Sequence, residues 1–120
     1  MTKPILYLLA PGFKGRGFDE TGSNKGRREY CPECAEMWGI LSYFPAIKEA
    51  LDIRYLPIEK PRTEMVKLLG ENHQNCPTLV LGEAAPDGVV TQIANGHVFI
   101  DNVRDIGNYF AAIYGTPFPR

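Results

Sequence analysis

The sequence has few of the residues that bind metals or form disulfide bonds. Its 120 residues include only three cysteines and two histidines. A small, odd number of cysteines excludes the dense disulfide framework that holds small secreted domains together. We therefore expect reduced thiols that act as metal ligands or redox groups.

The chain also lacks a long apolar run and an excess of charge of one sign. The N-terminal run from Ile5 to Ala10 is far shorter than the ~20 residues of a spanning helix, and Pro11 and Gly12 break it without a signal-peptide cleavage pattern. The formal net charge of −1 gives no overall reason to bind nucleic acid or an anionic membrane. We expect a cytoplasmic protein with neither partner; a protein partner, a small thiol and the oligomeric state are left open.

The composition is that of a chain that folds. Hydrophobic residues make up 44% and charged residues 22% of the sequence, which are ordinary globular values. Two domains in 120 residues would each be too small to bury much of a core. We therefore predict a single domain over residues 1–120.

Extended segments are predicted from short apolar runs and turn residues. "PILYLLA" (4–10) is continuously apolar, as in a central strand that is covered on both faces. Asn95-Gly96 predicts a hairpin turn between two extended runs. The remaining predicted strands cover 52–58, 78–82 and a short segment at 89–94.

Helices are predicted from caps and from apolar periodicity. One begins at Cys31, with Pro32 at its first position, and is interrupted at Pro45 before it continues to residue 50. A second is capped by Thr63 and ended by Gly70. The third is capped by Asn102 and ended by Gly115.

The resulting order is β-α-β-α-β-β-α, with an extra short strand at 89–94 and a long loop after the first strand. Residues 11–30 are rich in glycine and basic side chains and have no apolar period, so we predict a surface loop there. Parallel pairing of the first two strands through the helix at 31–50 is the default for such a crossover.

The main chemical signal is the pair Cys31 and Cys34, at the predicted start of a helix. Unpaired N–H groups and the helix dipole at this position stabilise a thiolate, and Arg27 and Arg28 add positive charge. Cys31 is then a suitable attacking sulfur, with Cys34 one turn on to resolve a mixed disulfide.

Three segments resemble the thioredoxin-like superfamily over nearly the whole chain. "CPEC" (31–34) is similar to a glutaredoxin active site, and "NCPTLVLG" (75–82) resembles the loop whose cis-proline faces that site. "FIDNVRDIGNYFAAIYG" is similar to the last strand and helix of the glutathione transferase N-terminal domain. The whole chain also resembles a bacterial thioredoxin-like family known only as a domain of unknown function.

This resemblance implies a thioredoxin-like α/β three-layer sandwich and assigns roles to residues. Cys31 takes the place of the attacking thiol, Cys34 of the resolving thiol and Pro77 of the cis-proline. Asp101 and Asn102 fall near the segment that holds the amino end of glutathione. The resemblance therefore implies a thiol-disulfide oxidoreductase that uses Cys31 and Cys34 and binds glutathione.

The same resemblance brings a second pair of residues to the thiols. If the loop before Pro77 faces Cys31, then Cys76 and His73 reach the same point, and Cys31, Cys34, His73 and Cys76 form a Cys₃His set. Three thiolates and an imidazole suit tetrahedral zinc. Our first hypothesis is therefore a zinc site built from C-x2-C and H-x2-C.

Other interpretations of these residues stay open. The same four ligands could hold an iron–sulfur cluster, although one histidine with three cysteines is a less common set. Cys76 alone fits a small buried hydrophobe, and His73 a solvated loop residue. The basic residues of 11–30 are most simply a solvated face, with an anion-binding lid as the alternative.

Overall fold

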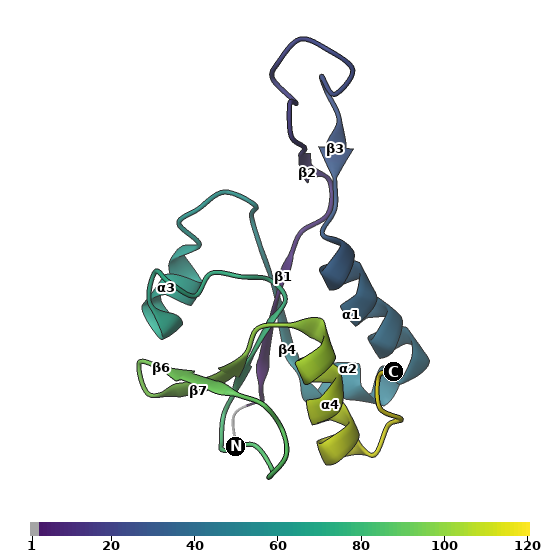
Figure 1. The fold of residues 1–120 in the computed structure, drawn as a ribbon, viewed down its shortest axis with the longest axis vertical. Coiled ribbons are helices and arrows are strands. Elements are labelled where there is room, and N and C mark those ends of the chain that lie inside the picture. The colour runs from purple at the N-terminus through teal and green to yellow at the C-terminus, as the bar shows by residue number, and fades with distance from the viewer. Residues whose placement is uncertain (1–2) are drawn as a thin grey trace.

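A computed structural model describes residues 3–120 and shows a mixed α/β protein (Figure 1). In these residues the main sheet has five strands in the order β4-β1-β5-β7-β6. Their bounds are β1 (Ile5–Leu9), β4 (Asp52–Leu56), β5 (Thr78–Leu81), β6 (Gln92–Ala94) and β7 (His97–Ile100). β1 pairs parallel with β4, as predicted, and antiparallel with β5, while β7 pairs antiparallel with β5 and β6.

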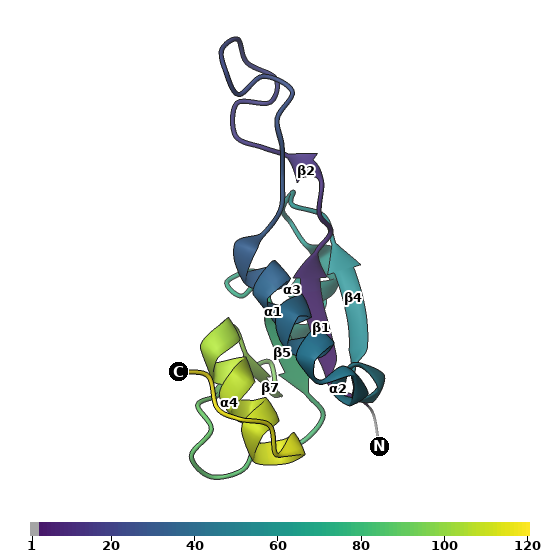
Figure 2. The same cartoon turned by 90° about the vertical axis from the view of Figure 1, so that its right-hand side faces the viewer.

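Helices cover the sheet on both sides. The described residues form four of them: α1 (Pro32–Tyr43), α2 (Pro45–Ala50), α3 (Thr63–Leu69) and α4 (Val103–Tyr114). α1, α2 and α4 lie on one side of the sheet and α3 on the other (Figures 1 and 2). The predicted break at Pro45 is confirmed, because α1 ends two residues before it and α2 begins at it.

The core is formed by side chains from both faces of the central strands. Tyr7, Phe99 and Phe110 are the largest side chains with almost no exposed surface. The burial of one such apolar side chain stabilises the fold by roughly 1.5–3 kcal/mol. β1 and β5 are buried along nearly their whole length, as expected of strands in the middle of a covered sheet.

The ends of α4 follow the sequence prediction, whereas the start of α3 does not. The Asn102 side chain accepts a hydrogen bond from the backbone N–H of Asp105 at 2.9 Å, and Gly115 ends the helix at φ 74°. Thr63 was predicted to cap α3, but it is the first helical residue. Arg62 precedes the helix and makes no side-chain cap, because its guanidinium has only donors and cannot accept a bond from the free N–H groups of the helix start.

Residues 11–30, which we call the arm, differ from the predicted loop without secondary structure. The short strands β2 (Phe13–Lys14) and β3 (Arg28–Glu29) pair antiparallel at its base. Its glycines permit further turns, and the Gly26 N–H donates to the Phe18 carbonyl at 2.9 Å. The arm projects from the end of the sheet where β1 leads into it (Figures 1 and 2).

The helices bear on the expectation that the protein has no membrane partner. Within residues 3–120, no helix combines the length and the apolar character that crossing a bilayer requires.

Candidate functional site

Cys31 lies where β1, the arm and α1 meet, and it is the N-cap residue of α1. Its Sγ accepts a hydrogen bond from the backbone N–H of Cys34 at 3.1 Å. A sulfur in this position satisfies one of the unpaired N–H groups at the helix start. The positive end of the helix dipole favours negative charge there, so the geometry suits a nucleophilic sulfur. Cys31 is half-buried and keeps access to solvent.

Cys34 lies one turn further along α1 and faces the core. Only 4% of its surface is exposed, and its Sγ accepts a hydrogen bond from the backbone N–H of Leu9 at 3.5 Å. Burial raises the pKa of the Cys34 thiol well above its ordinary value, and its hydrogen bond with Cys31 raises it further. Cys34 is therefore protonated at neutral pH and is the less reactive thiol of the pair.

The third cysteine approaches Cys31 through its backbone. The Cys76–Pro77 peptide bond is cis, and the Cys76 carbonyl oxygen lies 3.8 Å from the Cys31 Sγ. The Cys76 thiol is directed elsewhere, because its Sγ is 3.9 Å from the Met65 Sδ in the core. Burial raises the pKa of Cys76 to about 11, although the charge of Arg62 acts in the opposite direction.

The four predicted zinc ligands are not arranged as a metal site. The His73 ring packs against Phe99, with 5.0 Å between the ring centroids. Among residues 3–120, no three His, Cys, Asp or Glu side chains are grouped closely enough to hold a metal ion. Cys31, Cys34 and the Cys76 backbone are brought together, whereas the Cys76 thiol and His73 are occupied by core contacts. The zinc site stays a prediction.

The residues expected near glutathione lie next to the cis-proline loop. The Asn75 side-chain amide donates a hydrogen bond to the Asp101 carbonyl at 2.7 Å. Asn102 uses its side chain to cap α4 and also donates to the Asp105 carboxylate at 2.9 Å. The structure therefore joins the loop that precedes Pro77 to the start of α4.

A protein-family model described as "Protein of unknown function (DUF3088)" matches residues 3–118. The chain belongs to the DUF3088 family. No curated protein and no solved structure matches it.

Sequence reasoning missed one residue that positions the site of this DUF3088 chain. Arg62 is 6% exposed, and its guanidinium donates to the backbone carbonyls of Pro57, Ile58 and Gln74. The Gln74 side chain in turn accepts a hydrogen bond from the Arg62 backbone N–H at 2.7 Å. Arg62 therefore holds the loop that leads to Cys76. A lone arginine before a helix gives no sequence signal of such burial, because the burial depends on how the chain before Arg62 and the loop at Gln74 fold around the guanidinium.

Beside Cys31, the base of the DUF3088 arm and the start of α1 form a cleft of about 820 Å³. Leu9, Phe13 and Ile58 give it an apolar part. Its charged lining consists of four basic residues and one acidic residue: Lys14, Arg16, Arg27, Arg28 and Glu29. Cys31 therefore lines a cleft whose charged side chains are mostly positive.

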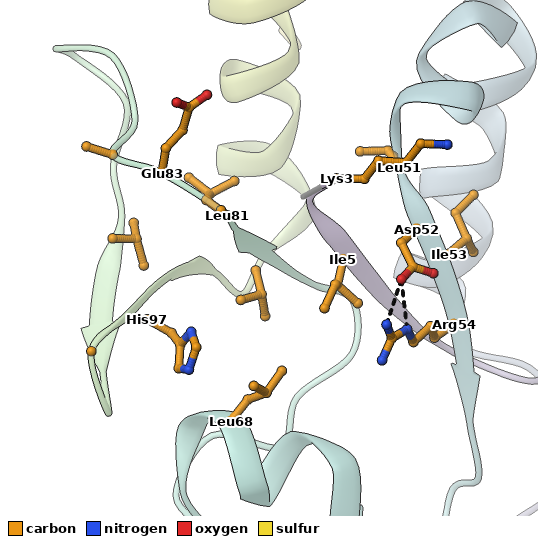
Figure 3. A pocket seen from close by; sticks show the side chains of 15 residues that line it. Lys3, Ile5, Leu51, Asp52, Ile53, Arg54, Leu68, Leu81, Glu83 and His97 are labelled. Atoms are coloured by element: carbon orange, nitrogen blue, oxygen red, sulfur yellow. Dashed lines mark hydrogen bonds and ion pairs between the residues drawn. The ribbon is translucent and has the colours of Figure 1, made fainter. Parts of the chain in front are cut away.

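A second cavity of about 940 Å³ lies on the α3 side of the sheet (Figure 3). It is at the opposite end of β1 from Cys31, because Ile5 lines this cavity and Leu9 lines the cleft of Cys31. The start of β1, β4 and the end of β5 line it, and Asp52 and Arg54 pair at 2.7 Å on its wall. None of the three cysteines is among its lining residues. The larger cavity is therefore separate from the three thiols.

Proposed function

We propose that this DUF3088 protein is a thiol-disulfide oxidoreductase with a thioredoxin-like fold. The observation that carries the proposal is the pair of thiols at the start of α1. Cys31 is half-buried and accepts an N–H bond, and Cys34 is buried and protonated beside it. The two thiols thus differ in exposure and in their place at the helix start, as an attacking and a resolving cysteine must.

The chain topology supports the thioredoxin-like part of the proposal. The parallel β1–β4 pair flanked by antiparallel β5 and β7, with α1 and α4 on one side and α3 on the other, matches the expected β-α-β-α-β-β-α arrangement. The cis Cys76–Pro77 bond beside Cys31 occurs where the resemblance expects it. β2 and β3 are additions to that arrangement, whereas β6 lies within the extra short strand predicted at 89–94.

The two thiols of the protein supply the two electrons that reduce the substrate disulfide. The Cys31 thiolate attacks one sulfur of a substrate disulfide, forms a mixed disulfide and releases the first thiol. The Cys34 thiol then gives up its proton and attacks the Cys31 sulfur, which releases the second thiol and leaves a Cys31–Cys34 disulfide. Two molecules of a small thiol reduce this disulfide and regenerate the starting state.

The neutral chromogenic disulfide dithiodipyridine tests the proposal. The wild-type protein should release two thiols for each Cys31–Cys34 disulfide formed, which mass spectrometry detects as the loss of two hydrogens. Cys34→Ser should release one thiol and accumulate a mixed disulfide on Cys31, because the resolving sulfur is absent. Cys76→Ser is the matched control and should behave as the wild type. Unchanged kinetics in Cys31→Ser would contradict the proposal.

A structural zinc site is the second candidate. Its support is that two segments 45 residues apart, at Cys31 and Cys76, meet, with Cys34 one helical turn from Cys31. Zinc binding would require the Cys76 thiol to leave Met65 and His73 to leave Phe99. Metal analysis of protein purified without chelator should find about one zinc per chain, lost in Cys76→Ser and in His73→Ala. Metal-free protein that unfolds cooperatively would contradict it.

A further inference from the structure

We propose that the cleft between the arm and Cys31 selects small disulfides that carry carboxylate groups. This inference rests on the proposed function, because it assigns a substrate class to the same thiol. It depends on the juxtaposition of Cys31 with Arg16 and Arg28 in one cleft.

The basic side chains that line the cleft differ in whether a carboxylate neutralises their charge. Glu29, its single acidic side chain, bonds to Arg27 at 2.6 Å and 2.9 Å, so these two charges cancel locally. Lys14 pairs with Asp19 at 3.3 Å. Within residues 3–120, neither Arg16 nor Arg28 has a carboxylate within ion-pair distance. Glu29 interacts mainly with Arg27 and more weakly with the charge of Arg16, so Arg28 is the more fully uncompensated of the two.

The arm holds the charge of Arg28 in place. Arg28 donates a hydrogen bond to the Gly12 carbonyl at 2.7 Å, and its guanidinium lies 5.1 Å from the centre of the Phe18 ring. The backbones of Gly12 and Gly15 are paired with Glu29 and Arg27 across the arm, each at 2.9 Å. A positive group that is fixed before the substrate arrives costs little ordering entropy on binding.

The size and the polarity of the cleft suit a small molecule. About 820 Å³ is within the range of roughly 300–1,000 Å³ that small-molecule sites occupy. Phe13 and Ile58 supply apolar contacts, and free guanidinium groups bind carboxylates through paired hydrogen bonds. A small disulfide with carboxylates therefore matches both parts of the lining, and its sulfur can face Cys31.

The test compares two small disulfides that differ in charge. Dithiobis(nitrobenzoate) carries two carboxylates, and dithiodipyridine is neutral. Each rate constant with Cys31 is divided by that disulfide's rate constant with a small uncharged thiol, which removes its intrinsic reactivity. The normalised rate for the anionic disulfide should exceed that for the neutral one by about tenfold at low salt.

Arginine variants locate the effect in the cleft. Arg16→Gln should lower the anionic rate about threefold to fivefold, and Arg16→Gln with Arg28→Gln should lower it about tenfold, since each removed charge weakens a short Coulomb attraction. The neutral rate should change less than twofold in Arg16→Gln. In the double variant the neutral rate should fall less than the anionic rate, because Arg28 also adds positive charge near the Cys31 sulfur. Lys25→Gln is the matched control, because Lys25 carries the same charge on the same arm but does not line the cleft; its anionic rate should stay within twofold.

A measurement on the wild type covers the case in which the double variant does not fold. Raising the ionic strength from about 0.01 M to about 1 M shortens the Debye length from ~30 Å to ~3 Å and should lower only the anionic rate. Equal, salt-independent normalised rates would overturn this inference and leave the proposed function standing. An equal loss in Lys25→Gln would also overturn it. If Cys31 reacts with neither disulfide, the proposed function itself fails.

Discussion

At the scale of single residues, the three cysteines differ because their sulfurs have different surroundings. Cys31 caps a helix at the edge of a cleft, Cys34 is buried beneath it, and the Cys76 thiol contacts Met65. We expect iodoacetamide at neutral pH to modify Cys31 first. The thiols of Cys34 and Cys76 should react much more slowly, because they are inaccessible and protonated.

The raised pKa of the Cys76 thiol predicts how its alkylation rate depends on pH. In a Cys31→Ser, Cys34→Ser variant, the rate of Cys76 alkylation should rise about tenfold per pH unit and level off near its pKa of about 11, because only the thiolate reacts. Mass spectrometry of peptides from timed samples gives the rates. Levelling off below pH 9 would show that burial does not hold the Cys76 proton.

Arg62 has the largest expected effect on stability of the residues near the site. Arg62→Met leaves the carbonyls of Pro57, Ile58 and Gln74 without their donor in a buried place. We expect the free energy of unfolding to fall by about 2–4 kcal/mol, since hydrogen bonds to charged groups contribute about 1.5–3 kcal/mol each and unmade buried ones are costly. Urea unfolding measures the change. Lys67→Met on the exposed side of α3 is the control and should change it by less than about 0.5 kcal/mol.

At the scale of elements, a polar cluster links β1, β4 and α3. The Glu64 carboxylate accepts hydrogen bonds from the Tyr7 hydroxyl and from Arg54, both at 2.6 Å. The hydrogen bond from Tyr7, and then that from Arg54, hold the pKa of Glu64 below its ordinary value. The cluster therefore stabilises the fold above the ordinary glutamate pKa, and this contribution is lost as the pH falls through the lowered folded value.

Glu64→Gln tests the cluster through the pH dependence of stability. At pH 7 the variant should unfold about 1 kcal/mol more easily, a modest value because the Glu64 side chain is 42% exposed. The difference from the wild type should shrink toward zero near pH 2, where the wild-type carboxylate is protonated. Glu49→Gln on α2 is the control, since Glu49 is in none of the ion pairs of residues 3–120. A difference that does not change with pH would contradict the linkage.

At the scale of the whole molecule, the arm makes the protein longer than its core. The radius of gyration is 15.4 Å, whereas a compact chain of 120 residues has about 14 Å. Residues 15–27 of the arm are absent from the core cluster and from the apolar side chains packed against it. The core and the tip of the arm are therefore expected to be energetically separate.

Shortening the arm tests this separation. Lys14 and Arg28 face each other across β2 and β3, so an Asn-Gly turn can replace residues 15–27. The free energy of unfolding should change by less than about 1 kcal/mol, while X-ray scattering shows the radius of gyration falling by about 1 Å or more. Reaction with neutral dithiodipyridine should continue, since Cys31 and Cys34 remain. A loss of cooperative unfolding would show that the tip contributes to the core.

Local features of the sequence accounted for most helix and strand positions. Pro45 ends α1 because its ring and missing N–H prevent continuation, and Asn102 and Gly115 bound α4 because their caps act within one turn. Asn95 and Gly96 both adopt positive φ in the β6–β7 turn, as that dipeptide predicts. The strands β4, β5 and β6 are shorter than predicted but lie within their predicted ranges.

The sequence by itself determined the position of the thiol pair at a helix start and the α/β order of the chain, because caps, turns and periodicity act between near neighbours. Only the tertiary structure decided what the other residues do. It placed His73 on Phe99 and the Cys76 thiol on Met65, and it set free guanidinium groups of the arm beside Cys31. These outcomes depend on packing between segments far apart in the chain. The spacing of residues in the sequence does not determine the direction in which a side chain points.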